Sequence, residues 1–132
     1  MSDVLPEIAM QEINPRISVR YEGEATIATF TDEKILEETD VRAIEQSLLS
    51  VIEEGKELNL VLDFSNVKFL SSEVLGLLIK LSRRIYERDG LLALCGINPK
   101  IYEIFKITRL TKVFDICKDV DAAIEHLLQD KE

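Results

Sequence analysis

The chain has 132 residues, the usual size of one domain, and its 46% hydrophobic and 31% charged residues suffice to bury a core. These values exclude a disordered chain, a collagen-like chain and a large multidomain enzyme. The net charge of -9 repels phosphate backbones, so we expect no direct binding of nucleic acid. The N-terminus lacks a signal-peptide pattern, and no apolar run reaches the roughly 18 residues of a membrane span. We therefore expect a cytoplasmic protein without membrane insertion.

The first part of the chain divides into an irregular segment and a hairpin. We expect irregular structure over residues 1–15 and one domain over residues 16–132. Residues 17–21 and 25–30 alternate in part between apolar and polar side chains, and the sequence EGE joins them. Two such runs around a glycine turn predict a β-hairpin.

A helix and a buried strand are expected next. Apolar residues recur at three and four positions over residues 41–52, which predicts an amphipathic helix capped by Thr39 or Asp40. Gly55 is placed to end this helix in the left-handed conformation. The run LNLVLDF at residues 58–64 has the continuous apolar character of an interior strand that is covered on both faces.

A second helix and a second interior strand are expected after this strand. Residues 72–89 carry a wide apolar face at helical spacing and predict a helix that lies on a sheet, with Gly90 as its stop signal. The run LLALCG at residues 91–96 predicts a second interior strand.

The last third of the chain predicts two more helices and a short strand. Asn98 followed by Pro99 predicts the start of a short helix with Ile101, Ile104 and Phe105 directed inward. Residues 113–116 predict a strand. Asp119 is expected to cap a last helix, whose inward residues are Val120, Ala123, Ile124, Leu127 and Leu128.

The predicted element order is ββαβαβαβα. Strand-helix-strand units of this kind favour right-handed crossovers and mainly parallel pairing, whereas the hairpin adds an antiparallel pair. We therefore predict one α/β domain with a mixed sheet of four or five strands and helices packed against it.

Patterns for catalysis and for cofactors are missing from the sequence. Cys95 and Cys117 have no CxxC spacing, so we interpret them as core residues rather than metal ligands. His126 lies in the predicted last helix, without an acid and base placed to activate a serine. The sequence has neither a GxSxG motif nor a glycine-rich phosphate loop. We expect no enzyme activity, no cofactor and no metal.

The segment after the first interior strand is the main candidate for function. In parallel sheets, working surfaces form where strands end and helices begin. Ser71 or Ser72 stands at the expected start of a helix, and the plain interpretation is a capping serine. The alternative is a phosphorylation site, because a helix N-terminus accommodates a phosphate that adds about -1.5 to -2 charges.

Residues 60–78, with the sequence LVLDFSNVKFLSSEVLGLL, resemble the signature of STAS domains, and specifically of bacterial anti-sigma-factor antagonists. In that family a strand ending in Asp-Leu-Ser-x-Val-x-Phe leads to Asp-Ser-Ser-Gly-Leu-Gly at the start of a helix. The element order also resembles the family along residues 16–130. The matching positions are Asp63, Ser65, Val67, Phe69, Leu75 and Gly76, and Ser72 falls on the serine that a partner kinase phosphorylates.

Three positions depart from this motif. Ser71 stands where the family has Asp, Glu73 where it has a second serine, and Val74 where it has the first glycine. Glu73 places a negative charge beside the expected phosphorylation site, and we expect Val74 to restrict the approach of a partner. Gly76 has two interpretations: close packing on a strand, which we favour, or contact with a partner.

The resemblance implies a partner switch. The unphosphorylated protein would bind an anti-sigma factor that is also a serine kinase, phosphorylation of Ser72 would release it, and a metal-dependent serine phosphatase would restore binding. The implied partner-binding residues are Asp63, Ser65, Ser71, Ser72, Glu73 and Gly76.

Two other hypotheses remain open. One is a constitutive STAS scaffold or subunit of a signalling or transport complex, and the other is an enzyme that binds a small ligand or lipid. The oligomeric state is left open as well.

One further stretch differs in charge from the rest of the chain. Residues 80–112 hold eight basic and three acidic residues. They predict either a solvated face or a landing surface for an acidic partner.

Overall fold

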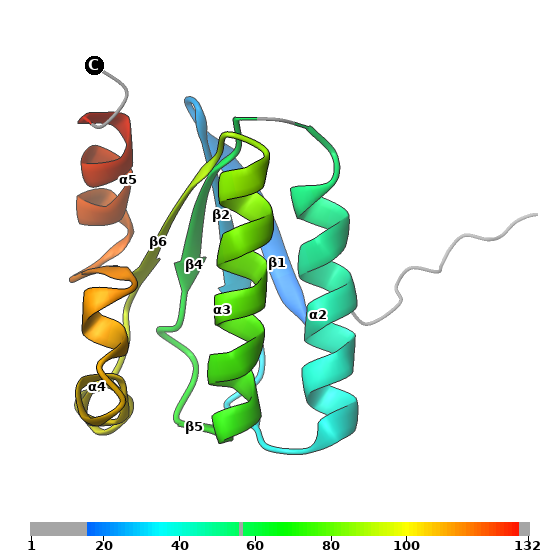
Figure 1. Ribbon diagram of the computed structural model, residues 1–132, viewed down its shortest axis with the longest axis vertical. Helices are drawn as coiled ribbons and strands as arrows, with labels where there is room; N and C mark the ends of the chain where they lie inside the picture. Colours follow the sequence, from blue (N-terminus) through cyan, green and yellow to red (C-terminus); the bar gives the residue numbers. More distant parts are fainter. Residues whose placement is uncertain (1–15, 56, 130–132) are drawn as a thin grey trace, which may run out of the picture.

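The computed structural model describes residues 16–55 and 57–129, so the predicted irregular segment 1–15 lies outside the described residues. A five-stranded sheet with the order β1-β2-β4-β6-β7 forms the centre of the molecule (Figure 1). Its strands are β1 (Ile17–Glu22), β2 (Ala25–Phe30), β4 (Asn59–Asp63), β6 (Leu91–Cys95) and β7 (Asp115–Cys117). The helices are α2 (Glu38–Ile52), α3 (Ser72–Glu87), α4 (Pro99–Ile107), the 3-10 turn η1 (Leu110–Lys112) and α5 (Val120–Gln129).

The sheet is mixed, as predicted. β1 pairs with β2 in the antiparallel sense, and β2, β4, β6 and β7 pair in parallel. The predicted hairpin, the two interior strands and the α/β class are therefore confirmed.

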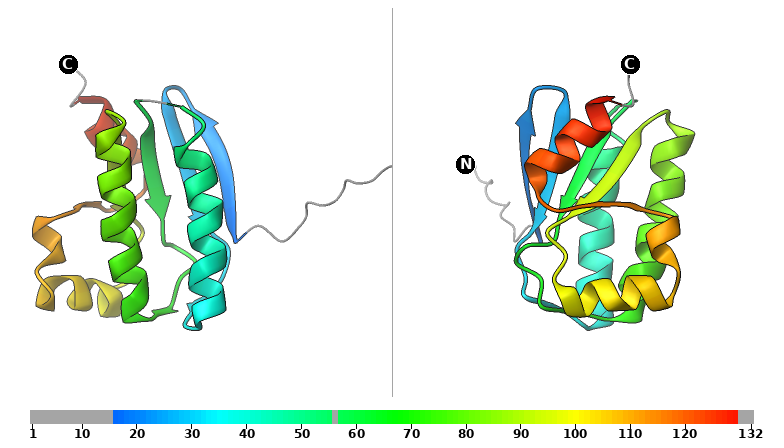
Figure 2. Two further views of the ribbon diagram at one scale, coloured as in Figure 1. Left: turned by 45° about the vertical axis from the view of Figure 1, so that its right-hand side comes forward. Right: turned by 90° about the vertical axis from the view of Figure 1, so that its left-hand side faces the viewer.

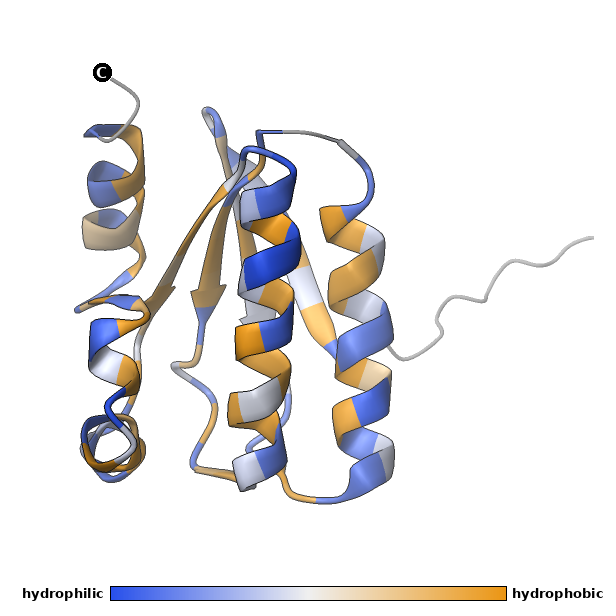
Figure 3. Cartoon of the chain, in the orientation of Figure 1, coloured by the Kyte–Doolittle hydropathy of each residue, from blue (hydrophilic) through white to orange (hydrophobic). Residues whose placement is uncertain are grey.

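Helices cover both faces of the sheet (Figures 1 and 2). On one face α2 and α3 pack against Leu60 and Leu62 of β4 and their neighbours. On the other face α5 places Ala123 and Leu127 against Val61 and the adjacent strands. All residues of β4 are buried, which explains its continuous apolar sequence, and Figure 3 shows the same apolar character along β4 and β6.

A two-stranded parallel sheet, which we did not predict, joins the two loops at the carboxyl end of the main sheet. β3 (Lys34–Ile35) pairs with β5 (Phe69–Leu70). In addition, the backbone N–H of Ser71 donates to the carbonyl of Ile35 at 3.0 Å. Strands of two residues carry no periodic pattern, so the sequence gives no signal for them. Their pairing fixes the starts of α2 and α3 to each other.

The start of α2 differs from the prediction. Its N-cap is Glu37, not Thr39 or Asp40. Asp40 lies one turn into the helix, where its carboxylate accepts from the backbone N–H of Glu37 at 3.2 Å and pairs with Arg16 at 2.8 Å. The hydrogen bond from Arg16 lowers the pKa of Asp40. Asp40 therefore ties the start of β1 to α2.

The predicted glycine stop signals are wrong in detail. The left-handed residues after α2 and α3 are Glu57, with φ 59°, and Asp89, with φ 63°, rather than Gly55 and Gly90. Gly90 instead allows its backbone to lie close to that of Leu58, because a Cβ at this position would be only 2.7 Å from the carbonyl oxygen of Leu58.

The C-terminal elements follow the prediction with two exceptions. The side chain of Asn98 caps α4 by accepting from Ile101 N–H at 2.9 Å, and Asp119 accepts from Ala122 N–H at 2.9 Å at the start of α5. Ile104, predicted to point inward, is exposed. The last strand begins at Asp115 rather than at residue 113, because η1 occupies part of the preceding chain.

Candidate partner-binding site

The loop between β4 and α3 is held firmly to the core. Phe64 is fully buried, its ring centroid lies 4.7 Å from that of Phe30, and its backbone N–H donates to the carbonyl of Cys95 at 2.9 Å. Val67 is also buried. The Asn98 amide donates to the Val67 carbonyl at 3.1 Å. The loop therefore presents its exposed residues on a fixed backbone.

The two serines at the start of α3 have different environments. Ser71 is the N-cap residue, but its hydroxyl makes no capping bond and is buried without a hydrogen-bond partner among the described residues. The expectation that a serine hydroxyl caps this helix is therefore wrong. Ser72 is the first residue of α3 and is exposed. Within the described ranges no side chain caps the first turn of α3, so its backbone N–H donors have no side-chain partner there.

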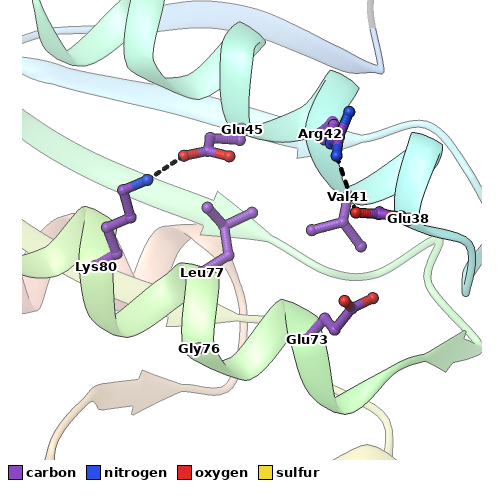
Figure 4. Close-up of a pocket in the computed structure, with 8 residues that line it drawn as sticks. All are labelled: Glu38, Val41, Arg42, Glu45, Glu73, Gly76, Leu77 and Lys80. Atoms are coloured by element: carbon purple, nitrogen blue, oxygen red, sulfur yellow. Dashed lines mark hydrogen bonds and ion pairs between the residues drawn. The ribbon is translucent and has the colours of Figure 1, made fainter.

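A groove of about 340 Å³ runs between α2 and α3, and Glu73, the residue after Ser72, is part of its lining (Figure 4). Val41 and Leu77 form its apolar floor, with Glu73 at one end and Lys80 at the other (Figure 4). The remaining lining residues are Glu38, Arg42, Glu45 and Gly76. Two ion pairs lie along its walls, one between Arg42 and Glu38 at 3.0 Å and one between Lys80 and Glu45. The groove thus combines an apolar floor with charged walls, as a protein docking surface does.

Gly76 is exposed in this groove, so the favoured packing interpretation is wrong. A Cβ built at Gly76 would meet nothing within 4 Å. The glycine therefore leaves the backbone of α3 open to an approaching partner. Val74, which we expected to restrict a partner, is buried in the core and does not face this surface.

We expect Gly76→Ala to stabilise the isolated protein by about 0.5–1 kcal/mol, because alanine in a helix loses less conformational entropy than glycine. Urea unfolding of the two proteins measures the change. Gly96→Ala is the matched control and should lower stability, since Gly96 has φ 69° and its Cβ would lie 2.8 Å from Asp63 Oδ1. A loss of stability in Gly76→Ala would contradict the open environment of Gly76.

The structure places Asp63 and Ser65 apart from this groove. Asp63 is buried, its Oδ1 accepts from the backbone N–H of Ser65 at 3.0 Å, and it extends toward the face of the sheet that α5 covers, as Val61 does. Both residues line a second pocket of about 410 Å³ with Gly96 and the start of α5. The predicted site residues therefore divide between two surfaces, and Asp63 holds the turn that begins the loop.

The prediction omitted the side of the site that α2 contributes. Glu38, Val41, Arg42 and Glu45 recur at helical spacing on one face of α2. This stripe is visible in the sequence, but only the packing of α2 against α3 shows that it faces Glu73 and Gly76.

A second omission is the apolar surface beside the groove. Phe69 of β5 and Leu36 after β3 are both about half exposed, and Lys34 lies over the Phe69 ring at 5.9 Å from its centroid. In the β3–β5 register Lys34 is opposite Phe69. The exposed Phe69 ring, on the strand that leads into α3, extends the candidate surface.

The remaining reactive side chains lie elsewhere. Burial raises the pKa of Cys95 to about 12 and also raises that of Cys117, so both thiols stay protonated. His126 lies on α5 with its Nε2 3.1 Å from Asp115 of β7. Within residues 16–55 and 57–129, no cluster of three acidic, histidine or cysteine side chains is arranged to hold a metal ion. Nor does any helix in these ranges have the length and apolar character to cross a membrane.

Comparison with known proteins agrees with this architecture. Residues 18–123 match the model of the STAS domain family. A Bordetella bronchiseptica protein, BtrV, named as an anti-sigma factor antagonist, is 24% identical over 89 residues, which are 67% of this chain and 76% of BtrV.

Solved structures show the same fold. An anti-sigma-factor antagonist (STAS) domain protein from Planctomyces limnophilus superposes with a TM-score of 0.76 and 25% identity, covering 88% of this chain and 98% of that one. The Bacillus cell fate determinant SpoIIAA in its phosphorylated form has a TM-score of 0.63 and 16% identity, covering 83% and 97% of the two chains. The chain belongs to the STAS domain family.

Proposed function

We propose that this protein is an anti-sigma-factor antagonist controlled by phosphorylation of Ser72. The unphosphorylated protein binds an anti-sigma factor that has serine kinase activity, and phosphorylation releases it. A metal-dependent serine phosphatase returns the protein to its binding form. The relatives named as anti-sigma factor antagonists support the partner class, and the phosphorylated form of SpoIIAA supports the kind of modification.

The exposed hydroxyl of Ser72 is the observation that carries this proposal. Ser72 is the first residue of a 16-residue helix and lies next to the α2–α3 groove. A phosphate at this position is favoured by the helix dipole, so modification need not disturb the fold. A kinase can reach Ser72 in the folded protein, whereas the buried hydroxyl of Ser71 is a poor acceptor.

Charge explains how the phosphate would release the partner. The near end of the groove already carries Glu73 and Glu38. Phosphorylation adds about -1.5 to -2 charges beside them at neutral pH. A partner surface that matches the unmodified site is then opposed by like charge and by the cost of desolvating the phosphate.

The test is to isolate the protein from growing and from stressed native cells and to locate phosphate by intact-mass and fragment-ion spectrometry. We expect phosphate on Ser72, in an amount that differs between the two states. It should be absent from Ser72→Ala and present in Ser71→Ala, which is the matched neighbour.

The constitutive scaffold is the competing function. It predicts an unmodified Ser72 in both states and a partner complex that phosphatase treatment does not change. That pair of results would overturn the proposed switch.

A further inference from the structure

The corner of the molecule formed by α4 and η1 has a surface unlike the rest of this acidic protein. We call it the α4–η1 face and define it by Lys100, Ile104, Ile107, Arg109, Lys112 and Val113. All six side chains are exposed. Residues 99–113 contain four basic residues and one acidic residue, whereas the whole chain has a net charge of -9. The face is therefore a basic island on an acidic molecule.

Three cations of this face make no ion pair with a described residue. Elsewhere in the basic stretch, Lys80 pairs with Glu45 and Arg84 with Glu53, and Arg88 donates to backbone carbonyls. By contrast, Lys100, Arg109 and Lys112 make no ion pair within the described part of the chain. Arg83 of α3 makes no ion pair there either, so Arg83, Lys100, Arg109 and Lys112 are the cations of the basic stretch left for an external anion, and three of them lie on the α4–η1 face.

Apolar side chains lie among these cations. Ile107 is 77% exposed, Val113 52% and Ile104 38%. Lys100, Ile104 and Ile107 are spaced by four and three residues, which places them on one side of α4. Exposed apolar side chains grouped with charges are typical of a surface that a partner covers.

Arg109 lies at the junction between α4 and η1. Arg109 follows the end of α4 in the left-handed conformation, with φ 66°. Glycine is the residue that usually occupies this position after a helix, because other side chains are strained there. Here an arginine occupies a strained position, and its guanidinium makes no ion pair with another described residue.

The α4–η1 face is separate from the serine site. In Figures 1 and 2, α3 stands between the α2–α3 groove and the α4–η1 corner. A partner on the α4–η1 face therefore need not displace one that covers the groove.

We propose that the α4–η1 face docks an acidic segment of a second protein, through apolar anchors that cover Ile104 and Ile107 and carboxylates that meet Lys100, Arg109 and Lys112. Charge complementarity favours this occupant. A second copy of the chain carries the same net charge of -9, and an anionic bilayer repels the remaining acidic surface. The exposed carboxylate of Glu103 on the same helix adds to that repulsion. The proposal does not depend on the phosphorylation of Ser72.

The test uses a synthetic helical peptide with leucine at positions i, i+3, i+4 and i+7 and glutamate elsewhere, titrated into the isotope-labelled protein and followed by amide chemical shifts. We expect saturable shifts in residues 99–114. One variant reverses three charges together (Lys100→Glu, Arg109→Glu and Lys112→Glu), and a second is Ile107→Glu. Each should weaken binding of the peptide about tenfold or more. Ser72→Asp should bind as the unaltered protein does.

Three controls distinguish an acidic protein segment from other molecules that could cover the α4–η1 face. Arg83→Glu changes an exposed cation outside the face and should bind the peptide normally. A peptide of the same composition in scrambled order, and one with lysine in place of glutamate, should bind weakly. Absent or scattered shifts, concentration-dependent shifts of the face without peptide, or binding of the face to phosphatidylglycerol vesicles but not to the peptide would each overturn the proposal.

Discussion

Ser72→Asp is expected to weaken binding of the anti-sigma factor by roughly two orders of magnitude, equivalent to about 2.7 kcal/mol. The reason is that a carboxylate at Ser72 stands beside Glu73 at the end of the groove, so the partner meets like charge where it met a hydroxyl. Ser72→Ala should retain affinity within about threefold, because an exposed hydroxyl contributes little net binding energy. Titration calorimetry with the purified anti-sigma factor measures both.

Stability should change in the opposite direction. A negative charge in the first turn of α3 interacts favourably with the helix dipole, so Ser72→Asp should unfold at an equal or slightly higher urea concentration. This separates loss of binding from loss of folding.

Ser50→Asp is the matched control for this prediction. It makes the same chemical change at an exposed serine of α2 that does not line the groove. Its affinity should equal that of the unaltered protein. If the anti-sigma factor bound Ser72→Ala, Ser72→Asp and the unaltered protein equally, Ser72 would not control docking.

The fold was predictable wherever many residues share one pattern. β4 and β6 are continuous apolar runs, and α2 and α3 have clear helical spacing, so packing and local preference agree in each. The residues predicted to end the helices were less reliable. Gly55 was expected to be left-handed and Gly90 to end the second helix, but Glu57 and Asp89 take the left-handed conformation. Gly90 instead lies close to Leu58, a tertiary contact that the local sequence does not show.

The candidate site was predictable as a segment but not as a surface. The segment starts at β4, where Asp63 extends toward the face that α5 covers, and ends in α3, which packs on the opposite face, so Asp63 and Ser65 lie in one pocket and Glu73 and Gly76 in another. Gly76 is a second example, since a glycine in a helix indicates either close packing on a neighbouring element or a backbone left open to a partner. Only the position of α2 decides between them.

Phe64 and Phe69 show how position in this loop sets the role of a side chain. Both are phenylalanines on the segment between β4 and α3, five residues apart in the numbering of the sequence. Phe64 is fully buried against Phe30, whereas Phe69 is 48% exposed beside Lys34. One residue therefore fixes the loop to the core, and the other is available to a partner.

Phe64→Ala is accordingly expected to lower the free energy of unfolding by about 3–5 kcal/mol, since it removes a buried ring and leaves a cavity. A domain of this size has about 5–15 kcal/mol in total, so this loss is a large share. Phe69→Ala, the matched control, should cost about 1 kcal/mol or less, because half of its ring is already in water.

Urea unfolding measures the stability of both variants, and binding of the anti-sigma factor separates their roles. We expect Phe69→Ala to weaken binding while the fold is retained, because the ring extends the apolar surface beside Ser72. Phe64→Ala should affect binding only through the lost stability, so affinity should recover at temperatures where this variant is fully folded. Equal losses of stability in the two variants would contradict the division between an anchoring and an exposed phenylalanine, and with it the fixed loop on which Ser72 is presented.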